Sequence, residues 1–281
     1  MNTVALFGAA GKIGSRISEK LRDDPTFRTL YVEAGEAGLA RLRDRGLTPS
    51  SGEEAMGEAD TIVLAIPDTL IGTVAADLVP QLRSGTLVIL LDPAAPHGGE
   101  LPERKDIAYL CVHPCHPPIV NDEVEPEARA DFWGGVARQN LVCALIQGTE
   151  EDYARGERIS RAMFAPILNV HRITVEQMAI LEPAMAETVI LTCMVVMREA
   201  IEEAIARGVP RQVAYDFALG HMRVNLGILF GYIDAEVSEG AKLAVEHAKK
   251  SVFQPDWKKV FEPENVIAQV RAIVEGRSAK R

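Results

Sequence analysis

Two histidines three residues apart stand in the proline-rich stretch His113-Pro114-Cys115-His116-Pro117-Pro118. Histidine is the commonest metal ligand and the side chain that titrates nearest neutral pH. The three prolines restrict the backbone, and the apolar run at 107–112 just before them indicates a strand. This pattern predicts a rigid loop at the carboxyl edge of a sheet, which is where parallel α/β folds bind ligands.

The first half of the chain alternates apolar runs with helical patterns. Strands are predicted at 4–7, 28–33, 61–66, 86–91, 107–112, 141–146 and 167–173. Helices are predicted between them, most clearly at 12–22, 70–82 and 150–164. Continuous apolar strands that alternate with helices are typical of a parallel sheet covered on both faces.

The second half is helical. Its predicted helices span 174–207, 211–231, 239–249 and 263–275, with Thr174 as the first N-cap and a kink at Glu182-Pro183. We therefore predict an α/β fold with an N-terminal Rossmann-type parallel sheet and a C-terminal all-helical domain. Residues 1–170 would bind a dinucleotide, and residues 171–281 would serve substrate binding and dimerisation.

A glycine-rich turn, Gly8-Ala-Ala-Gly-Lys-Ile-Gly14, follows the first strand and opens the first helix. Glycines allow a tight turn and close approach of a pyrophosphate, and the helix N-terminus offers free N–H groups. The spacing is GxxGxxG, which is less specific than GxGxxG, and a glycine-rich turn without a cofactor is the alternative. The predicted dinucleotide contacts here are Gly8, Ala10, Gly11, Lys12, Ile13 and Gly14.

Two acids extend this prediction. Glu33 ends the second strand, where a carboxylate accepts hydrogen bonds from ribose hydroxyls and repels a 2′-phosphate, so NAD is predicted over NADP. A plain surface glutamate is the alternative. Asp68 follows the third strand and is predicted either to contact the second ribose or to cap the helix that follows.

No lysine occurs between Lys105 and Lys242. The two-half layout resembles the phosphogluconate and β-hydroxyacid dehydrogenase superfamily, whose hydroxyacid enzymes carry a catalytic lysine on the long interdomain helix. That lysine is absent from this chain. His113-Pro114 is also similar to a His-Pro dipeptide of the prephenate dehydrogenases. That likeness implies that His113 faces the nicotinamide and takes the proton of the substrate hydroxyl.

The glycine-rich turn, the His113–Pro118 stretch and Leu181-Glu182-Pro183 together resemble the D-apionate oxidoisomerase family. This resemblance implies an NAD-dependent enzyme that oxidises a branched sugar acid and shifts a carbon group to give a 3-oxo acid. Such a rearrangement requires two neighbouring oxygens to be polarised together, which a divalent metal does well. The alternatives are a metal-independent hydroxyacid or prephenate-like dehydrogenase that uses His113, and an NAD-sensing regulator.

His116 and Glu182 are the predicted metal ligands, because a carboxylate within an apolar helix is rarely buried without a partner or a metal. His113 is then the acid/base. Glu187 would lie about 140° around an α-helix from Glu182, so that one ion reaches both only if Pro183 distorts the turn. Zinc or manganese fits such nitrogen and oxygen ligands. Capped loop histidines and a helix-kink glutamate are the non-metal alternatives.

His221, Arg223 and Asn225 are predicted substrate contacts, since such groups bind a carboxylate and hydroxyls. Helix packing is the alternative for these three. His97, His171 and His247 fit no pattern.

The totals exclude some classes of function. The net charge of −10 disfavours a nucleic-acid-binding surface. The four cysteines form no CxxC pair and are expected to be reduced. No leader and no run approaching 18 apolar residues is visible, so we expect a cytoplasmic protein without a membrane partner. The helix 174–207 is apolar around much of its circumference, which favours a homodimer that shares it.

Overall fold

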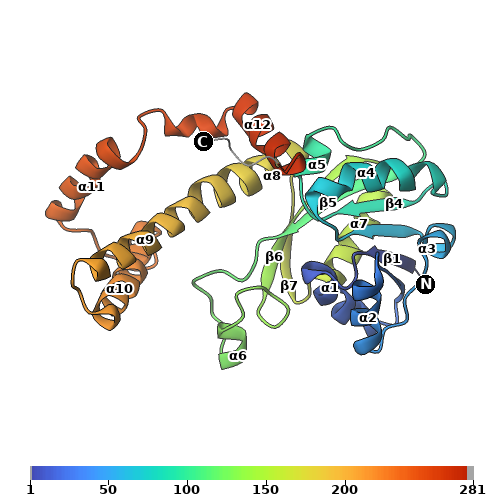
Figure 1. Cartoon of the computed structure of the whole chain (residues 1–281), viewed down its shortest axis with the longest axis horizontal. Coiled ribbons are helices and arrows are strands. Elements are labelled where there is room, and N and C mark those ends of the chain that lie inside the picture. Colours follow the sequence, from blue (N-terminus) through green and yellow to red (C-terminus); the bar gives the residue numbers. More distant parts are fainter. Residues whose placement is uncertain (1, 277–281) are drawn as a thin grey trace. The chain divides into compact units, whose positions relative to one another are not determined.

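The computed structural model of the chain describes residues 2–276 (Figure 1). Contacts among its residues divide it into two compact units. The first contains the chain up to Glu182 and the segment from Ile267 onward, and the second runs from Pro183 to Val266. The division into functional domains at residue 170 stays a prediction, since the change in contacts comes later, within the long helix.

A seven-stranded sheet forms the centre of the first unit, in the order β2-β1-β3-β4-β5-β6-β7. The strand order reverses between β1 and β3, and such a switch point is where dinucleotides bind in this class of fold. All seven predicted strands are present. They are β1 (Asn2–Phe7), β2 (Phe27–Val32), β3 (Thr61–Leu64), β4 (Leu87–Leu90), β5 (Ala108–Pro114), β6 (Gln139–Gln147) and β7 (Ile167–Arg172).

The Rossmann-type sheet is confirmed, but it is not parallel throughout. The strands from β2 to β5 are parallel, whereas β6 pairs antiparallel to β5, and β7 is parallel to β6. A parallel return requires a crossover, usually a helix, that runs back along the sheet. The connection from β5 to β6 holds only the four-residue α6 (Pro126–Arg129), so β6 returns in the opposite direction.

Helices cover both faces of the sheet, and each face has its own apolar core. One core includes side chains of α1 (Lys12–Arg22), α2 (Glu36–Asp44) and α7 (Glu150–Met163). The other includes α3 (Gly52–Glu58), α4 (Asp68–Leu78), α5 (Ala94–His97) and α8 (Val175–Ala179). Sequence periodicity missed α2, α3 and α5, which are too short to show a clear helical repeat. The short helix η1 (Val79–Gln81) continues α4.

The long predicted helix is not uniform. Thr174 caps it as predicted, in a reciprocal capping box with Gln177. After α8 the backbone forms a π-helix, η2 (Ile180–Leu191), and then α9 (Thr192–Ala206). Pro183 lies inside η2. Proline lacks the N–H of the α-helical ladder, and here the wider π-helix takes the place of the predicted kink.

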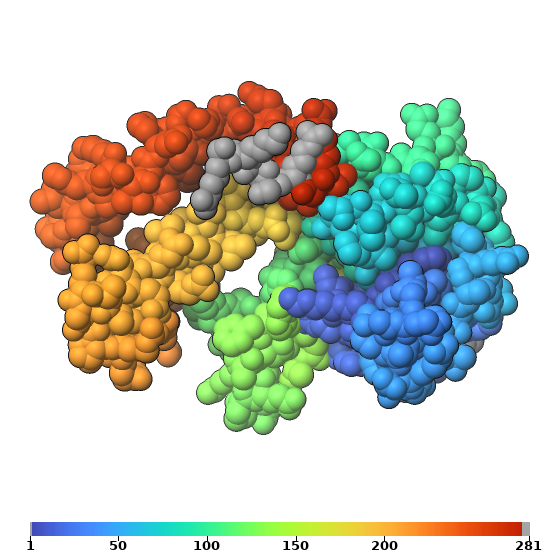
Figure 2. All heavy atoms as spheres, viewed as in Figure 1, coloured from blue at the N-terminus to red at the C-terminus, as the bar shows by residue number. Residues whose placement is uncertain are grey.

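The second unit consists of helices with little buried apolar surface. Besides most of η2 and α9 it contains α10 (Arg211–Leu229), α11 (Glu239–Val252) and η3 (Trp257–Phe261). Figure 2 shows α10, in orange, at the surface. Many large apolar side chains are exposed on these helices, among them Ile190, Leu191, Met194, Val195, Val196, Met197, Val213, Phe217, Leu219 and Val224. The last helix, α12 (Pro263–Val274), passes from the second unit into the first, where Val270 is buried near Gly98.

The continuous helix Val175–Ala206 is long and apolar enough, by length and composition alone, to cross a membrane. Its most apolar window has a mean hydropathy of 1.7 and is 11% buried. Most of its apolar side chains are therefore exposed or half-buried in the single chain. The acids Glu176, Glu182 and Glu187 interrupt the apolar run as the sequence indicated, but the helix continues through them. The expected absence of a membrane partner stays a prediction.

Candidate active site

The glycine-rich turn connects β1 to α1 and has the geometry that its glycines predict. Gly8 has φ +79°, and a Cβ there would lie 2.3 Å from the carbonyl oxygen of Ala65. A Cβ on Gly14 would lie 1.9 Å from the carbonyl oxygen of Gly8. Only glycine fits both positions, so β1, β3 and the first turn of α1 can approach closely. The N-cap Gly11 provides no side-chain cap, and the first N–H groups of α1 remain available to an anion.

Glu33 lies against this turn, one residue beyond β2. Its Oε1 accepts a hydrogen bond from the backbone N–H of Ala10 at 2.6 Å, and its Oε2 accepts one from Ala34 at 3.2 Å. A carboxylate in this place stands beside the pyrophosphate turn, where an adenosine ribose is bound in this class of fold. Its role as a ribose ligand stays a prediction.

Three side chains meet at the carboxyl edge of the sheet. Asp92 comes two residues after β4, His113 lies near the end of the neighbouring β5, and Glu182 comes from η2. One ligand atom from each lies within 4.8 Å of the others. Oxygen and nitrogen ligands of a shared cation, each about 2.0–2.6 Å from the ion, are separated by at most about 5 Å. We call these three residues the acid–histidine cluster.

The tautomer of His113 follows from its contacts. Its Nδ1 lies 2.8 Å from the carbonyl oxygen of Leu91, which can only accept, so Nδ1 carries a proton. Its Nε2 lies 3.4 Å from Oε2 of Glu182. In the neutral ring Nε2 is a hydrogen-bond acceptor, and the Glu182 carboxylate beside it is also an acceptor. The two atoms attract each other only when a proton or a cation lies between them. The backbone contact thus aims His113 as a metal ligand or as a base.

Asp68, at the start of α4, belongs to the same electrostatic environment. The pKa of Asp68 is raised to about 6, mainly by burial and also by the negative charges of Asp92 and Glu182, while a backbone hydrogen bond and His113 act in the opposite direction. Acids that repel one another in this way favour the binding of a positive charge. Asp68 was predicted to contact a ribose. It also interacts electrostatically with all three residues of the acid–histidine cluster.

Of the two predicted metal ligands, His116 and Glu182, only Glu182 belongs to the cluster, which also contains the predicted acid/base His113 and one further residue. Asp92, which sequence reasoning missed, stands with His113 and Glu182, whereas no ligand atom of His116 is in the group. Asp92 could have been found, because it follows the strand next to that of His113, and parallel strands end at one edge. His116 as a ligand stays a prediction that this arrangement does not favour.

His116 instead belongs to a loop between β5 and β6, residues 115–138. Its Nδ1 lies 3.0 Å from the carbonyl oxygen of Trp133, and its ring meets those of Trp133 and His113 edge-on, with centroids 5.7 and 6.2 Å away. Its φ of 61° is the only positive value at a non-glycine residue among those described. Backbone strain of this kind gathers at functional sites, and here it lies next to the cluster.

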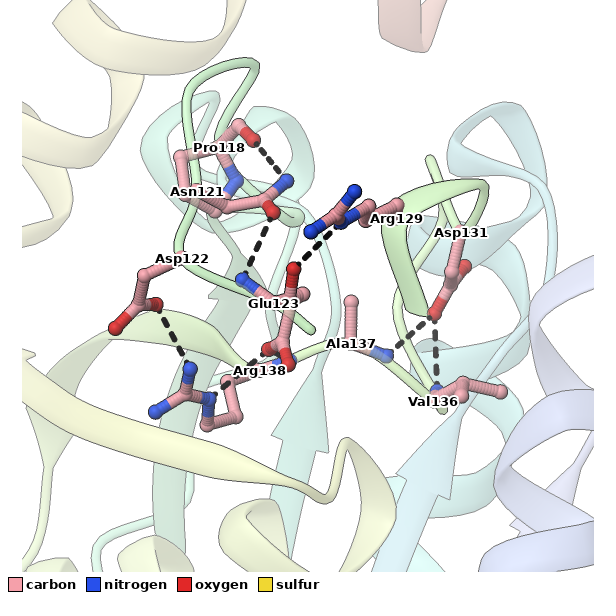
Figure 3. Close-up of polar contacts among 9 residues, drawn as sticks. All are labelled: Pro118, Asn121, Asp122, Glu123, Arg129, Asp131, Val136, Ala137 and Arg138. Carbon is pink, nitrogen blue, oxygen red and sulfur yellow. Dashed lines mark hydrogen bonds and ion pairs between the residues drawn. The ribbon is translucent and has the colours of Figure 1, made fainter. Parts of the chain in front are cut away.

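The same loop holds itself together through acids that are fully engaged (Figure 3). Arg138 donates hydrogen bonds to Glu123 and Asp122 at 2.9 and 2.7 Å. Asp131 accepts four backbone N–H bonds at 2.9 to 3.0 Å. Partial burial raises the pKa of Asp131, but these four bonds outweigh it, and the net pKa is lowered. We call Asp122, Glu123, Asp131 and Arg138 the loop clasp.

The π-helix changes the expectation for Glu187. In a π-helix each residue bonds to the fifth along the chain, so residues five apart lie near the same face. Glu187 therefore shares a face of η2 with Glu182, rather than lying about 140° away as in an α-helix. The distortion that would allow both carboxylates to face one direction is present.

The three predicted substrate residues all lie on α10. His221 stacks on Phe217 at 4.0 Å between ring centroids, and its Nδ1 is 2.8 Å from the carbonyl oxygen of Phe217. Arg223 and Asn225 are exposed. On an α-helix Asn225 shares the face of His221, whereas Arg223 points elsewhere. Their contact with substrate stays a prediction.

A known protein family and individual proteins that resemble this chain agree with one another. The model of the C-terminal region of decarboxylating phosphogluconate dehydrogenase matches residues 121–274. The D-apionate oxidoisomerase of Rhizobium rhizogenes is 46% identical and that of Cupriavidus necator is also 46% identical. These matches cover 97% and 96% of this chain, and 100% and 98% of the relatives.

Solved structures agree. A semialdehyde dehydrogenase NAD-binding protein from Cupriavidus necator, in complex with calcium and NAD, has a TM-score of 0.94 at 45% identity. The match covers 97% of this chain and 99% of that one. An NADH-preferring ketol-acid reductoisomerase from an uncultured archaeon has a TM-score of 0.69 at 16% identity, over 98% and 82% of the two chains, and shares the fold.

Proposed function

Because the chain belongs to the D-apionate oxidoisomerase family, we propose that it oxidises D-apionate or a similar branched sugar acid with NAD and rearranges the product to a 3-oxo acid. It is an enzyme of the NAD-dependent oxidoreductase class. The proposed chemistry rests on one observation. The acid–histidine cluster stands at the same sheet edge as the glycine-rich turn.

NAD would bind along this edge. The pyrophosphate would lie at the N-terminus of α1 beside Gly11, and the adenosine ribose at Glu33. Asp68, which follows β3, would stand toward the second ribose. A related protein was solved with NAD, which supports this assignment of the cofactor.

A divalent cation would bind Asp92, His113 and Glu182. The fit rests on the converging ligand atoms and on the Nε2 of His113, which faces a carboxylate. One imidazole and two carboxylates are a hard donor set, suited to manganese and also to zinc. Bound there, a divalent cation supplies Lewis acidity for two adjacent substrate oxygens. The calcium in a related structure supports a cation without fixing which one.

The residues of the chain would perform the remaining steps. Hydride passes from the carbon of a secondary alcohol to the nicotinamide, and the hydroxyl proton passes to a base, which leaves a ketone and NADH. A carbon group on the neighbouring carbon would then migrate with its electron pair to the new carbonyl carbon. The neighbouring hydroxyl loses its proton to become the 3-oxo group, and the former carbonyl oxygen takes up a proton to become a hydroxyl, so the rearrangement is an isomerisation. With a cation bound, Nε2 of His113 would be a ligand, and the hydroxyl proton would pass to another base. With Nε2 free, as in the metal-independent alternative, His113 itself is the proposed proton acceptor.

A second candidate function follows from the same contact. If no cation binds, Nε2 of His113 is free to take the hydroxyl proton, and Glu182, 3.4 Å away, stabilises the positive charge that results. The protein would then be a metal-independent hydroxyacid or prephenate-like dehydrogenase. Product analysis separates the two, because only the oxidoisomerase changes the carbon skeleton.

The test incubates the full-length protein with D-apionate and NAD, before and after chelation, and identifies the product by NMR. We expect a rearranged 3-oxo acid, loss of turnover after chelation, and recovery with Mn²⁺ or Zn²⁺. Glu182→Gln should abolish the recovery, whereas Asp122→Asn, a carboxylate of the loop clasp, should not change it. A simple 2-oxo product with full activity after chelation would establish the second candidate.

We also propose that a second copy of the chain covers the exposed apolar helices. The accessible surface is 16560 Å². Two separate compact bodies of the sizes of the two units would expose only about 14,000 Å² together. The excess of roughly 2,500 Å² falls in the range of obligate dimer interfaces. A cytoplasmic location stays a prediction.

Light scattering tests the dimer. We expect a mass of two chains for the wild type, a mass of one chain for Phe217→Glu combined with Met194→Lys, and no change for Lys258→Gln. A single-chain mass together with flotation on phosphatidylglycerol vesicles would assign the helix Val175–Ala206 to a membrane instead.

A further inference from the structure

Three basic side chains form one ridge along α1. Lys12, Arg16 and Lys20 are spaced four residues apart, so they lie on one face of the helix. All three contact the same short piece of the 115–138 loop. Arg16 donates a hydrogen bond to the carbonyl oxygen of Gly134 at 2.5 Å, and Lys20 donates one to that of Gly135 at 2.7 Å.

Lys12 makes a different contact from the other two. Its Nζ lies 4.0 Å from the centre of the Trp133 ring, and the Arg16 guanidinium carbon lies 5.3 Å from it. Lys12 is the first residue of α1 and belongs to the turn that would bind the pyrophosphate. The indole therefore holds a positive charge at the place where an anion is expected.

The backbone that carries the ring is fixed from two sides. Asp131 accepts hydrogen bonds from the backbone N–H groups of Trp133 and Gly134. Farther along the chain, Arg138 binds the other two acids of the loop clasp (Figure 3). On the other side the carbonyl oxygen of Trp133 contacts Nδ1 of His116. The indole is 50% exposed. This exposure does not come from a loosely held loop, because the backbone on both sides of Trp133 is hydrogen-bonded.

A lysine side chain is flexible, and fixing it in one conformation has an entropic cost. A ring that already holds the ammonium reduces the freedom that is lost when the ligand binds. Resting on the proposed binding of NAD, we propose that Trp133 is a positioning residue that holds Lys12 ready for the dinucleotide pyrophosphate. The loop between β5 and β6 is then part of the cofactor site.

A double-mutant cycle on NAD affinity tests this coupling. Calorimetry would measure the Kd for NAD of the wild type, Lys12→Met, Trp133→Leu and the double variant. We expect each single change to weaken binding about 3- to 30-fold, in the range of cation–π contacts, and the double variant to bind NAD as well as Lys12→Met does. If the two effects instead multiply, the residues act independently and the inference is wrong.

Matched variants separate positioning from mere folding. Trp133→Phe keeps an aromatic face and should restore Kd to within about threefold of the wild type. Lys20→Met removes a contact to the same loop from the same ridge, but two turns away from the cofactor turn, and should leave Kd unchanged. Equal weakening by Lys20→Met would show that only the anchoring of the loop matters. Trp133→Gln replaces Trp133→Leu if the latter fails to fold.

The two proposals fail in different ways. If the wild type does not bind NAD in calorimetry, the proposed function is wrong. If it binds NAD and Trp133→Leu binds it equally well, the proposed function stands and the role of Trp133 is wrong.

Discussion

The acid–histidine cluster and the loop clasp are two acidic groups in the same unit, and they are built in opposite ways. In the loop clasp every carboxylate meets donors, and the pKa of Asp131 and that of Glu123 are both lowered. At the sheet edge acids meet acids, and the pKa of Asp68 is raised to about 6. The first arrangement stabilises a loop by itself. The second raises the pKa of a buried acid, and perturbed pKa values of this kind are typical of functional sites.

The largest effect is expected where this contrast is sharpest. Asp92→Asn or Glu182→Gln removes a charge from the proposed cation site, and kcat/KM should fall by about a thousandfold or more. Thermal unfolding should change little, or the variants should be slightly more stable without metal, because a repulsion is relieved. Steady-state assays and melting curves with chelator measure both. Unchanged kcat/KM in both variants would make the cluster structural.

Glu33 gives the next largest effect. Glu33→Ser removes the predicted ribose acceptor and should weaken NAD binding about tenfold. The same change should strengthen NADP binding, because the carboxylate that repels the 2′-phosphate is gone. Calorimetry with both dinucleotides measures the ratio of their Kd values. The control is Glu36→Gln, which changes an exposed acid three residues away on α2. A wild type that binds NADP as well as NAD already contradicts the assignment.

Asp131 tests the other side of the comparison. Asp131→Asn loses charge-assisted bonds to the backbone and should lower the free energy of unfolding by about 1–3 kcal/mol. Because the folded pKa is lowered, the contribution of Asp131 is present above its unfolded value and is lost as the pH falls through the folded value. Denaturant unfolding at pH 7 and pH 3 should therefore show a difference that shrinks in acid. An equal difference at both values would contradict this.

Asp68 should give the smallest and opposite effect. Its folded pKa is raised from 3.8 to about 6, so the folded state holds a proton that the unfolded state releases. The stability of the metal-free wild type should fall, relative to Asp68→Asn, as the pH rises from about 4 to about 6, and then level off. Melting temperatures at pH 5 and pH 7.5 measure this difference. If the melting temperature of the wild type instead rises relative to that of Asp68→Asn between pH 5 and pH 7.5, the pKa of Asp68 is not raised.

Much of the fold was predictable because its signals are local. Most of the strands contain short apolar runs, and Thr174 was recognisable as a cap. The direction of β6 was not predictable from its own residues. It depends on the absence of a crossover helix in the loop before it.

The site was predictable in part for a similar reason. His113 and Glu182 stand out by type and context, and the structure places them 3.4 Å apart. Asp92 reads locally as a turn residue before Pro93, and only the sheet order brings it to His113. The π-helix, which moves Glu187 to the face of Glu182, has no sequence signal beyond Pro183.

The return of α12 to the first unit has a consequence for unfolding. Because the chain leaves that unit at Glu182 and re-enters it at Ile267, the helices between are an insertion tied at both ends. If they melt while the first unit stays folded, they form a closed loop, which has less configurational entropy than a free tail of equal length. An otherwise poorly buried set of helices is thereby protected against local melting by the connectivity of the chain alone.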